Sequence, residues 1–381
     1  MYFDNAATTW PKPQRVEKAV ANAMRCYGAN PGRSSHKMAM ETAQQVFNSR
    51  EAAAALFGAE VDQVVFTSNC THALNMAIKG VLQPGDHVII SQMEHNSVLR
   101  PVHTLAQNGM ITYSILPIRR DAKDTLACLE TLVRPCTKLI ACTHGSNVWG
   151  LTAPIKEIGE LAEKRDIFFM VDAAQTAGVI DINVKEAHID FLCTAGHKSL
   201  YGPPGTGLLI TPHGEAMATL MEGGTGSVSS MFVQPAAMPE RMESGTANTS
   251  GIIGLGAGIA FVTESGIANI YAHEMAIAKE IYTCLNNCDN ILLYTDGFEE
   301  GRNLPLVSFN IEGLHSEETV EALAAKGYAL RGGLHCAPLA HEMMGTTDIG
   351  AARISVGAFN TRAQARCLCR EICRMAKSAA A

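Results

Sequence analysis

Between about residues 60 and 210, short apolar or β-branched runs alternate with amphipathic stretches. The runs are apolar almost without interruption, as expected of strands buried on both faces. The stretches between them repeat their apolar positions with the period of a helix. This alternation predicts a mostly parallel seven-stranded sheet with helices on both sides, with strands at 64–67, 87–91, 111–116, 138–142, 167–171, 189–193 and 207–210 and helices at 71–81, 97–107, 125–133 and 155–164.

The C-terminal third of the chain has a different pattern, in which longer helical stretches alternate with shorter strands. We predict a smaller α+β unit there, with helices at about 264–287, 316–326 and 361–377 and strands near 305–311, 328–331 and 352–357. The domain prediction is a large unit at 14–262 and a small unit made of 1–13 and 263–381. The segment 5–13, rich in Thr, Ala and Pro, is expected to pack near the site.

Composition and charge narrow the class of protein. Of 381 residues, 47% are hydrophobic and 18% charged, which is globular usage and excludes long disordered regions. The net charge of −7 and the lack of a basic block argue against a nucleic-acid groove. The N-terminus lacks the pattern of a signal peptide, and the longest apolar run, 252–262, is too short for a bilayer span. We therefore expect a soluble cytoplasmic protein that spans no membrane.

Twelve cysteines are scattered through the chain, and none forms a C-x-x-C pair. Cys284 and Cys288, and likewise Cys369 and Cys373, are four residues apart, so each pair shares a helix face. Zinc ligation would need further His or Cys at suitable spacing, which is absent. We expect reduced cysteines that serve as small apolar core residues, and no metal site.

A lysine and an acid follow two strands of the predicted sheet. Lys198 stands in a Gly- and Pro-rich turn after 189–193, and Asp172 ends the strand at 167–171. Alone, such a lysine is usually a solvated loop residue. Ligands of an open α/β sheet bind at the carboxyl ends of strands, which brings the two side chains to one edge. An amine that can form a Schiff base and an acid that pairs with a pyridinium nitrogen are what a pyridoxal phosphate (PLP) site requires.

Two further segments supply the remaining parts of such a site. Thr71 stands at the start of a predicted helix after strand 64–67, where backbone N–H groups and the helix dipole favour a phosphate. Such a residue is otherwise a helix cap. His95 follows the strand at 87–91 and is the candidate ring to lie against the pyridine. The alternative for His95 is a hydrogen-bonded loop residue.

Eight segments resemble those of class V aminotransferase-fold enzymes, in the same order along nearly the whole chain: TSNCTHALN, MEHNS, GSNVWG, VDAAQ, AGHKSLYGPPGTG, ESGTANTSG, RGGLHCAPL and ARISVGAFNT. The lysine turn and the RGGLHCA stretch are the specific parts. Among these enzymes the chain is most similar to cysteine desulfurases and the related selenocysteine lyases. The resemblance implies a PLP-dependent α/β protein of aminotransferase fold type I, with a smaller α+β C-terminal domain.

The resemblance also assigns cofactor roles. Lys198 would carry PLP, Asp172 would pair with the pyridine nitrogen, and His95 would stack on the ring. The other cofactor residues would be Gln175 at the pyridine hydroxyl; Cys70, Thr71 and His197 at the phosphate; and Thr246, which reaches the phosphate of the partner subunit in a homodimer. A serine that is frequent in the lysine turn is replaced here by Ala195, which Thr194 would have to compensate.

Substrate roles follow in the same way. Arg353 would bind the substrate carboxylate through two parallel hydrogen bonds, because guanidinium geometry matches a carboxylate. Asn147 would assist Arg353 in this role, and Arg331 would also belong to the substrate-binding residues. His36 resembles a histidine on the substrate side of the site. His95 is also the candidate proton shuttle to the substrate thiol.

Cys336 decides between the chemistries of this fold. It stands in a short Gly-punctuated loop, where Arg331 and His335 would favour its thiolate, the nucleophilic form. The short loop resembles the group II branch of the desulfurases and implies that a sulfur-acceptor protein docks to receive a persulfide. The segment 223–243 is shorter than in that branch, where it forms a hairpin beside the partner's site.

The resulting hypothesis is a cysteine desulfurase that converts L-cysteine to L-alanine and leaves a persulfide on Cys336. A selenocysteine lyase acting on L-selenocysteine is the first alternative. An aminotransferase on the same fold would have no need of Cys336, and a non-catalytic scaffold for sulfur carriers would have no need of Lys198.

Overall fold

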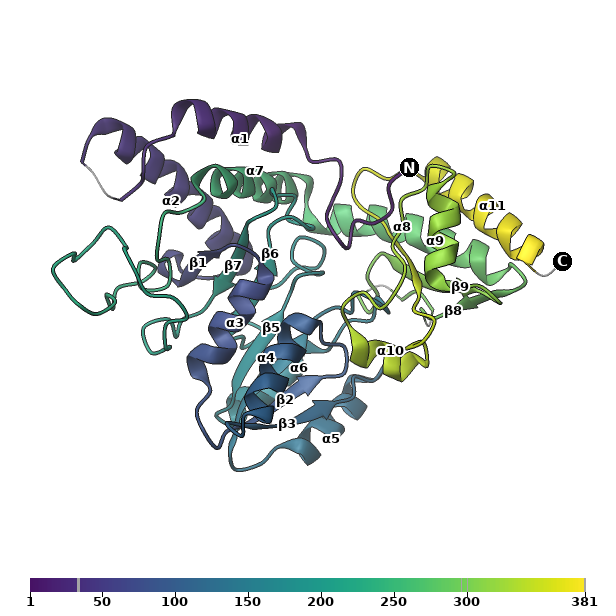
Figure 1. The fold of residues 1–381 in the computed structure, drawn as a ribbon, viewed down its shortest axis with the longest axis horizontal. Coiled ribbons are helices and arrows are strands. Elements are labelled where there is room, and N and C mark those ends of the chain that lie inside the picture. The colour runs from purple at the N-terminus through teal and green to yellow at the C-terminus, as the bar shows by residue number, and fades with distance from the viewer. Residues whose placement is uncertain (33–34, 296, 300, 380–381) are drawn as a thin grey trace.

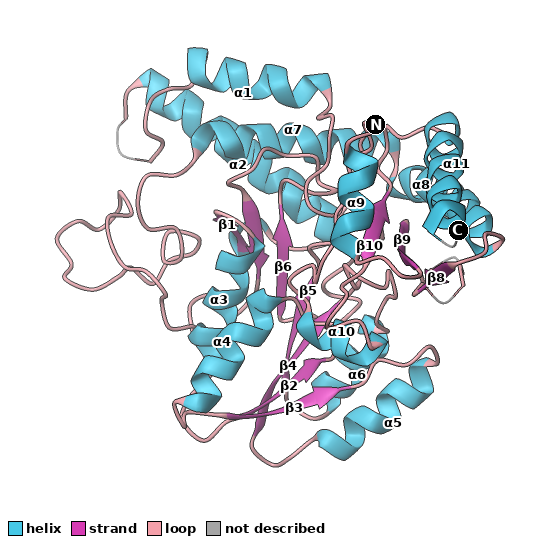
Figure 2. Ribbon diagram, turned by 45° about the vertical axis from the view of Figure 1, so that its right-hand side comes forward, coloured by secondary structure: helices cyan, strands magenta, loops and turns pink. Residues whose placement is uncertain are grey.

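A seven-stranded sheet forms the centre of the larger part of the molecule (Figure 2). The structure is a computed structural model and describes residues 1–32, 35–295, 297–299 and 301–379. The strand order is β1-β7-β6-β5-β4-β2-β3, and β7 alone runs antiparallel to its neighbours. The mostly parallel sheet is therefore confirmed, with strands β1 Val64–Thr67, β2 His87–Ser91, β3 Thr112–Leu116, β4 Thr137–Thr143, β5 Phe168–Asp172, β6 Phe191–Ala195 and β7 Gly207–Ile210.

Alternate residues of each strand enter two different apolar layers, because successive side chains point to opposite faces of a sheet. Ile89 packs in the layer on one face, and Val88 and Ile90 pack in the layer on the other. All three are fully buried, which explains why the strand sequences are apolar throughout. Within this seven-stranded sheet, only the edge strand β3 has exposed positions.

Helices cover both faces of the sheet (Figure 1). On one face lie α3 Cys70–Val81 and α4 Asn96–Gln107. On the other lie α2 Lys37–Phe57, α5 Ala122–Leu132, α6 Ile155–Lys164 and α7 Thr249–Ser265. The helix α1 Gln14–Cys26 lies outside α7. The hydrophobic pattern predicts α3 to α6 but no helix in the regions of α1, α2 and α7.

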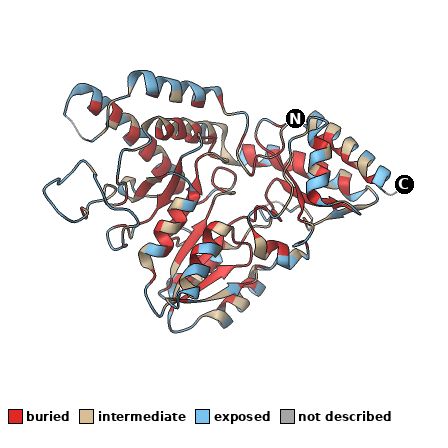
Figure 3. Cartoon of the chain, in the orientation of Figure 1, coloured by how far each residue is buried: buried red, intermediate tan, exposed pale blue. Residues whose placement is uncertain are grey.

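A second, smaller sheet of order β10-β9-β8 builds the C-terminal unit. Its strands are β8 Ile291–Leu293, β9 Leu306–Ile311 and β10 Ala352–Ser355, and its helices are α8 Ile267–Asn286, α9 Ser316–Ala324 and α11 Arg362–Ala379, with α10 Pro338–Met344 beside them. Figure 3 shows the buried core of this unit apart from that of the large sheet. Phe3 packs in it with Phe309 and Leu368, so the N-terminal residues join this unit. The division at 262/263 stays a prediction.

The strand predicted near 328–331 is wrong. Ala329 and Arg331 form only isolated bridges, to Tyr2 and Arg353. Ala329 pairs with Tyr2 of the N-terminal segment. This segment forms only isolated bridges, so no continuous strand pairing extends through 328–331. The third strand is instead β8, whose three residues are too few to show a pattern.

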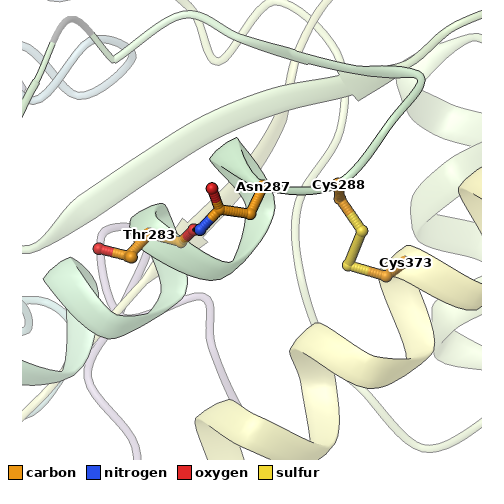
Figure 4. The surroundings of a disulfide bond; sticks show 4 residues. All are labelled: Thr283, Asn287, Cys288 and Cys373. Carbon is orange, nitrogen blue, oxygen red and sulfur yellow. A yellow bond between two sulfur atoms is a disulfide. The ribbon is translucent and has the colours of Figure 1, made fainter.

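The expectation that all cysteines are reduced is also wrong, because Cys288 and Cys373 form a disulfide (Figure 4). The other ten cysteines are free. Cys369 and Cys373 share a face of α11, as predicted, but Cys288 lies two residues beyond the end of α8, so the prediction for Cys284 and Cys288 is wrong. The spacing of the cysteines also cannot show that α8 and α11 pack together. Cys284 lies against Cys369, and burial, assisted by Cys284, raises the pKa of the Cys369 thiol.

Among the described residues, no group of three or more His, Cys, Asp or Glu could hold a metal ion.

The Gly-rich sequence of α7 serves close packing against the lysine turn. A Cβ on Gly258 would lie 2.2 Å from the carbonyl oxygen of Leu200, two residues beyond Lys198. Glycine therefore lets the helix touch the backbone that positions the lysine.

In the described part of the chain, no single helix is long and apolar enough to cross a membrane. The helices α7 and α8 meet the length and composition criterion only as a pair, which is bent by 80°.

Glu274 of α8 is a buried acid at the contact between the two units. Its Oε1 accepts a hydrogen bond of 3.3 Å from the Tyr201 hydroxyl, which in turn accepts one of 2.8 Å from the backbone N–H of Ala358. Burial raises the pKa of Glu274 to about 8, and the hydrogen bond from Tyr201 opposes this. The carboxyl is therefore protonated in the folded protein at neutral pH.

We expect Glu274→Gln to flatten the decline of stability with rising pH. A raised pKa in the folded state gives a stabilising contribution that is complete below the ordinary value of 4.5 and is lost as the pH rises through about 8. The amide mimics the neutral acid, so the difference in Tm between variant and parent should grow by a few degrees from pH 5 to pH 8.5. Calorimetry measures it, with Glu157→Gln on the surface of α6 as the control. Parallel Tm curves would contradict the assignment.

Candidate active site

A cavity of about 210 Å³ lies where the parallel strands of the large sheet end. Thr143 ends β4, Asp172 ends β5 and Ala195 ends β6, and all three line the cavity. The start of α3 and the loop before α4 close one side, and the N-terminal segment and the C-terminal unit close the other. This is the edge at which open α/β sheets bind ligands.

Lys198 is held in a turn with several backbone hydrogen bonds. The Tyr201 N–H donates to the Lys198 carbonyl at 2.8 Å, and the Gly202 N–H donates to the Gly196 carbonyl at 2.8 Å. From the N-terminal segment, the Thr9 hydroxyl donates to the Lys198 carbonyl at 2.9 Å. Burial lowers the pKa of the Lys198 amine, and Asp172 opposes this shift. A neutral, nucleophilic amine is therefore favoured.

Asp172 faces the same cavity with one oxygen already satisfied. Its Oδ1 accepts from the Ala174 N–H at 2.9 Å and from the Cys70 thiol at 3.4 Å. The residue is 5% exposed. Burial, with the charge of Asp172, raises the pKa of the Cys70 thiol, so Cys70 acts as a neutral donor here. Oδ2 has no hydrogen bond from the described residues and can pair with a ligand cation.

The start of α3 forms an anion cradle. Asn69 caps the helix by accepting from the His72 N–H at 2.9 Å, which leaves the N–H groups of Cys70 and Thr71 among the unpaired donors of a first turn. His197 is half-buried and also lines the cavity, and its buried Nδ1 atom has no hydrogen-bond partner in the described structure. Unpaired N–H groups and an orphaned imidazole nitrogen fit the phosphate of a phosphorylated cofactor.

His95 caps α4 and is oriented by Ser97. Its Nδ1 accepts from the Ser97 N–H at 3.1 Å and lies 2.8 Å from the Ser97 hydroxyl, which is 2.7 Å from the Thr71 hydroxyl. Burial lowers the pKa of His95, and Asp172 opposes it. In the neutral ring the proton is then on Nε2. The sequence did not indicate Ser97 as the hydrogen-bond partner of His95, because no motif marks this contact between the two side chains.

Glu94 joins the ends of β2 and β4 behind His95. Its carboxyl accepts from the Ser91 hydroxyl at 2.5 Å and from the N–H and hydroxyl of Thr143, both at 2.7 Å. Burial raises the pKa of Glu94 to about 7, and these hydrogen bonds oppose the shift. The sequence motif contains Glu94, but its bridging role depends on strand neighbours that are far apart in the chain.

Arg353 has one buried donor, its Nε atom, that is left for a ligand. Its Nη2 donates to Asp4 Oδ1 at 2.8 Å and its Nη1 donates to the Asn147 carbonyl at 3.0 Å. The Nε atom is buried without a partner in the described structure, and the residue is 1% exposed. The Nε–Nη2 edge is the one that binds a carboxylate through two parallel hydrogen bonds. No sequence motif indicated Asp4, which lies 349 residues away from Arg353 in the chain.

The Cys336 loop is fixed by neighbours on several sides. The Cys336 carbonyl accepts from the Asn96 N–H at 2.7 Å, and the His335 carbonyl accepts from the Asn147 side-chain amide at 2.8 Å. The backbone φ of Cys336 is +58°. Its thiol is exposed, 4.0 Å from Nη2 of Arg331, and both Arg331 and His335 line the cavity. Cys336 therefore stands at the rim of the cavity.

The expectation that His335 supplies charge to Cys336 is wrong. Its Nε2 lies 2.8 Å from the Ala351 carbonyl, and its ring stacks on His341. Burial and then the charge of Arg353 lower the pKa of His335 to about 2. The ring is neutral and bonded inside the protein, so Arg331 is the cation beside the thiol.

Comparison with known proteins agrees with this geometry. Residues 1–368 match the family model described as aminotransferase class-V. The chain belongs to the aminotransferase class-V family.

Cysteine desulfurases are among its relatives in this family. A probable cysteine desulfurase of Methanothermobacter thermautotrophicus is 31% identical over 371 residues, 95% of this chain and 91% of the relative. The cysteine desulfurase IscS of Dictyoglomus turgidum is 38% identical over 59% of this chain and 57% of its own. The solved structure of a cysteine desulfurase from Thermococcus onnurineus superimposes with a TM-score of 0.91 at 30% identity and covers 99% of this chain and 95% of its own. The resemblance to cysteine desulfurases is thus confirmed.

The predicted site residues of this family member fall into two groups. The cavity brings together those at the strand ends and in the C-terminal unit, namely Cys70, Thr71, His95, Asn147, Asp172, Gln175, His197, Lys198, Arg331 and Arg353. Four others lie outside its lining. Cys336 is at the rim, His36 is exposed and caps α2, Thr246 is exposed, and Thr194 is buried with its hydroxyl 3.4 Å from the Ala173 carbonyl.

Thr194 therefore cannot replace the hydroxyl that Ala195 lacks. Successive residues of β6 point to opposite faces, so Ala195 lines the cavity and Thr194 points away. The hydroxyl of the serine that is frequent at the position of Ala195 is therefore absent here, and Thr194 does not supply one in its place. The groups at this end of the cavity that could hold a phosphate are therefore Thr71, the α3 backbone and His197.

Proposed function

We propose that this chain is a PLP-dependent cysteine desulfurase that releases L-alanine from L-cysteine and holds the sulfur on Cys336. The observation that carries the proposal is the arrangement of Lys198 and Asp172 in one cavity with Cys336 on its rim beside Arg331. An aminotransferase would use the same amine and acid, but it has no use for a thiol at that position.

The cofactor residues and the chemistry of the cofactor fit together. Lys198 would hold PLP covalently, Oδ2 of Asp172 would pair with the pyridine nitrogen, and Gln175 and His95 would contact the ring. The α3 N-terminus, Thr71 and His197 would hold the phosphate. Bound PLP supplies an electron sink that weakens the bonds at the substrate Cα.

Arg353 would bind the substrate carboxylate with its Nε–Nη2 edge. Asp4 and the Asn147 carbonyl fix the guanidinium plane, so the edge is oriented before substrate arrives. The buried, unpaired Nε atom gains its acceptor only when a carboxylate is present. The carboxylate thereby places the substrate sulfur toward the rim that carries Cys336.

Lys198 and His95 would move the protons. The Lys198 amine, whose pKa burial lowers, accepts the Cα proton at Nζ. Neutral His95 has its proton on Nε2 and exchanges it with the substrate thiol. Ser97 keeps the ring in this tautomer by donating to Nδ1.

The thiolate of Cys336 would attack the substrate sulfur. A sulfur–sulfur bond forms and the carbon–sulfur bond breaks, with its electron pair retained on the carbon that becomes the alanine methyl group. The loop is anchored at Asn96 and Asn147, so the persulfide stays at the cavity rim. An acceptor protein must then dock there to remove the sulfur.

Mass spectrometry of the protein after incubation with L-cysteine tests the proposal. A gain of one sulfur atom on the Cys336 peptide, with L-alanine as product, is the expected result. Formation of an oxo acid without alanine would indicate an aminotransferase instead. Comparing alanine release from cysteine and selenocysteine determines which chalcogen is preferred.

Asp4→Ala should raise the KM for cysteine about tenfold and leave kcat within about threefold. Without Asp4 the buried guanidinium loses its ion pair and its fixed orientation, so the substrate carboxylate is bound less well. Steady-state alanine release measures both constants. Asp181→Ala, distant from Arg353 in the sequence and outside the cavity lining, is the control. An unchanged KM would remove Asp4 from substrate binding.

We also propose that the enzyme is a homodimer in which Thr246 approaches the partner's phosphate site. Many exposed apolar side chains gather on α1, α2 and the irregular segment between β7 and α7, at the left in Figure 1. A hollow of about 730 Å³ lies between α2 and this segment. These side chains, which a second copy would cover, are Met24, Met38, Met40, Phe47, Leu220, Met221, Val228, Met231, Phe232 and Val233.

Phe47→Asp combined with Phe232→Asp should convert the dimer to monomers. Two charges in an apolar interface would each remain buried without a partner. Sedimentation velocity measures the mass, and Leu292→Asp, on an exposed position of β8, should leave the dimer intact. A parent protein that sediments as a single chain would contradict the dimer.

A further inference from the structure

A second cavity, of about 290 Å³, lies between the large sheet and the C-terminal unit. It shares no lining residue with the active cavity. Its apolar walls come from Ile118, Trp149, Leu151 and the two methionines Met343 and Met344 at the end of α10. Its volume is close to the lower end of the range for small-molecule sites. A molecule with an apolar body about the size of a benzene ring fits such walls.

One buried polar group of a residue that lines this cavity lacks a hydrogen-bond partner. The indole Nε1 of Trp149 is buried and has no hydrogen-bond acceptor within the described structure, although Trp149 is 7% exposed. A buried indole N–H normally finds an acceptor. The indole N–H of Trp149 is therefore a donor that an oxygen atom of a ligand could satisfy.

Three arginines contribute to the same cavity. Arg119, Arg120 and Arg302 line it. Arg120 and Arg302 share the carboxylate of Glu299, at 3.4 Å and 4.0 Å. The Arg119 guanidinium has no carboxylate partner among the described residues. An oxygen anion would satisfy both Arg119 and the indole N–H.

We propose that this cavity binds a small organic anion, with an apolar or aromatic body between Trp149 and the methionines and a carboxylate or phosphate facing Arg119. Apolar walls with a few polar groups that fix orientation are the usual composition of such sites. An aromatic body suits the site best, because it can stack on the indole and on the arginine planes.

The position of the cavity connects it to the active site through one loop. Asn147 lines the active cavity and donates to the His335 carbonyl, and Trp149, two residues later, lines the second cavity. The helix α10, which contributes Met343 and Met344, begins two residues after Cys336. A ligand in the second cavity contacts the elements on both sides of the Cys336 loop.

Fluorescence of Trp149 tests the proposal independently of the reaction. The chain has two tryptophans, and Trp10 is exposed, so Trp10→Phe leaves Trp149 as the only reporter. In the cofactor-loaded Trp10→Phe protein, benzoate or phenyl phosphate should change the emission saturably, with a Kd of about 1 mM or tighter. Acetate, which lacks the body, and benzyl alcohol, which lacks the charge, should bind at least about tenfold more weakly.

Arg119→Met in the same background should weaken benzoate or phenyl phosphate binding about tenfold or more. The Arg119 backbone N–H bonds the Thr125 hydroxyl at 2.9 Å, a contact that the substitution keeps. Two results would overturn the proposal: no saturable change with either anion, or a change that survives Arg119→Met and disappears in Arg353→Met. The second result would place the anion in the active cavity.

Discussion

Cys336→Ser should reduce alanine formation from L-cysteine by about 100-fold or more. A serine hydroxyl is not ionised at neutral pH and is a poor nucleophile toward sulfur, whereas a thiolate attacks sulfur readily. The side chain is exposed at the cavity rim, so the substitution leaves the cofactor residues in place. The yellow absorbance of the bound cofactor and its response to cysteine should therefore remain. Assays of alanine and sulfide, with absorbance spectra, measure both effects.

The chain supplies a matched control for this variant. Cys136 is also exposed and free, and it precedes β4 at the opposite end of the sheet from the site. Cys136→Ser should keep the activity within about twofold, the size of most surface effects. If Cys336→Ser retained the parent rate, sulfur would leave the substrate without this nucleophile, and the assignment of Cys336 would be wrong.

The sheet was predictable because its signal is local. A strand buried on both faces must be apolar throughout, and β1, β2 and β7 have the predicted bounds. The strand ends then place Lys198 and Asp172 at one edge, since parallel strands end on the same side. This part of the site needed no knowledge of tertiary structure beyond the fold class.

The remaining contacts depend on the packing of segments that are distant in sequence. Asp4 meets Arg353 only because the N-terminal segment lies beside β10. Cys288 meets Cys373 only because α8 packs on α11. His335 stands next to Cys336 in sequence, yet its ring turns away to His341. Neither spacing nor composition contains this information, and proximity along the chain was misleading for His335.

Lys198→Ala should abolish covalent retention of the cofactor and reduce turnover by about 1,000-fold or more. The variant removes the one lysine among the described residues that line the cavity, and burial lowers the pKa of its amine. The other basic side chains of this lining are arginines and histidines. Absorbance after gel filtration shows retention, and alanine release shows turnover. Lys123→Ala, on the surface of α5, should change neither.

Rescue by small amines separates the chemical role of Lys198 from a structural one. The substitution leaves space in the cavity for methylamine or ethylamine, which can accept the Cα proton in place of Nζ. Part of the lost turnover should return in proportion to the concentration of neutral amine, so rescue should increase as the pH rises toward the pKa of the added amine. A folding defect would not respond to amine. If turnover stayed high in Lys198→Ala without added amine, or if the variant kept the cofactor covalently, another residue would have to be the base.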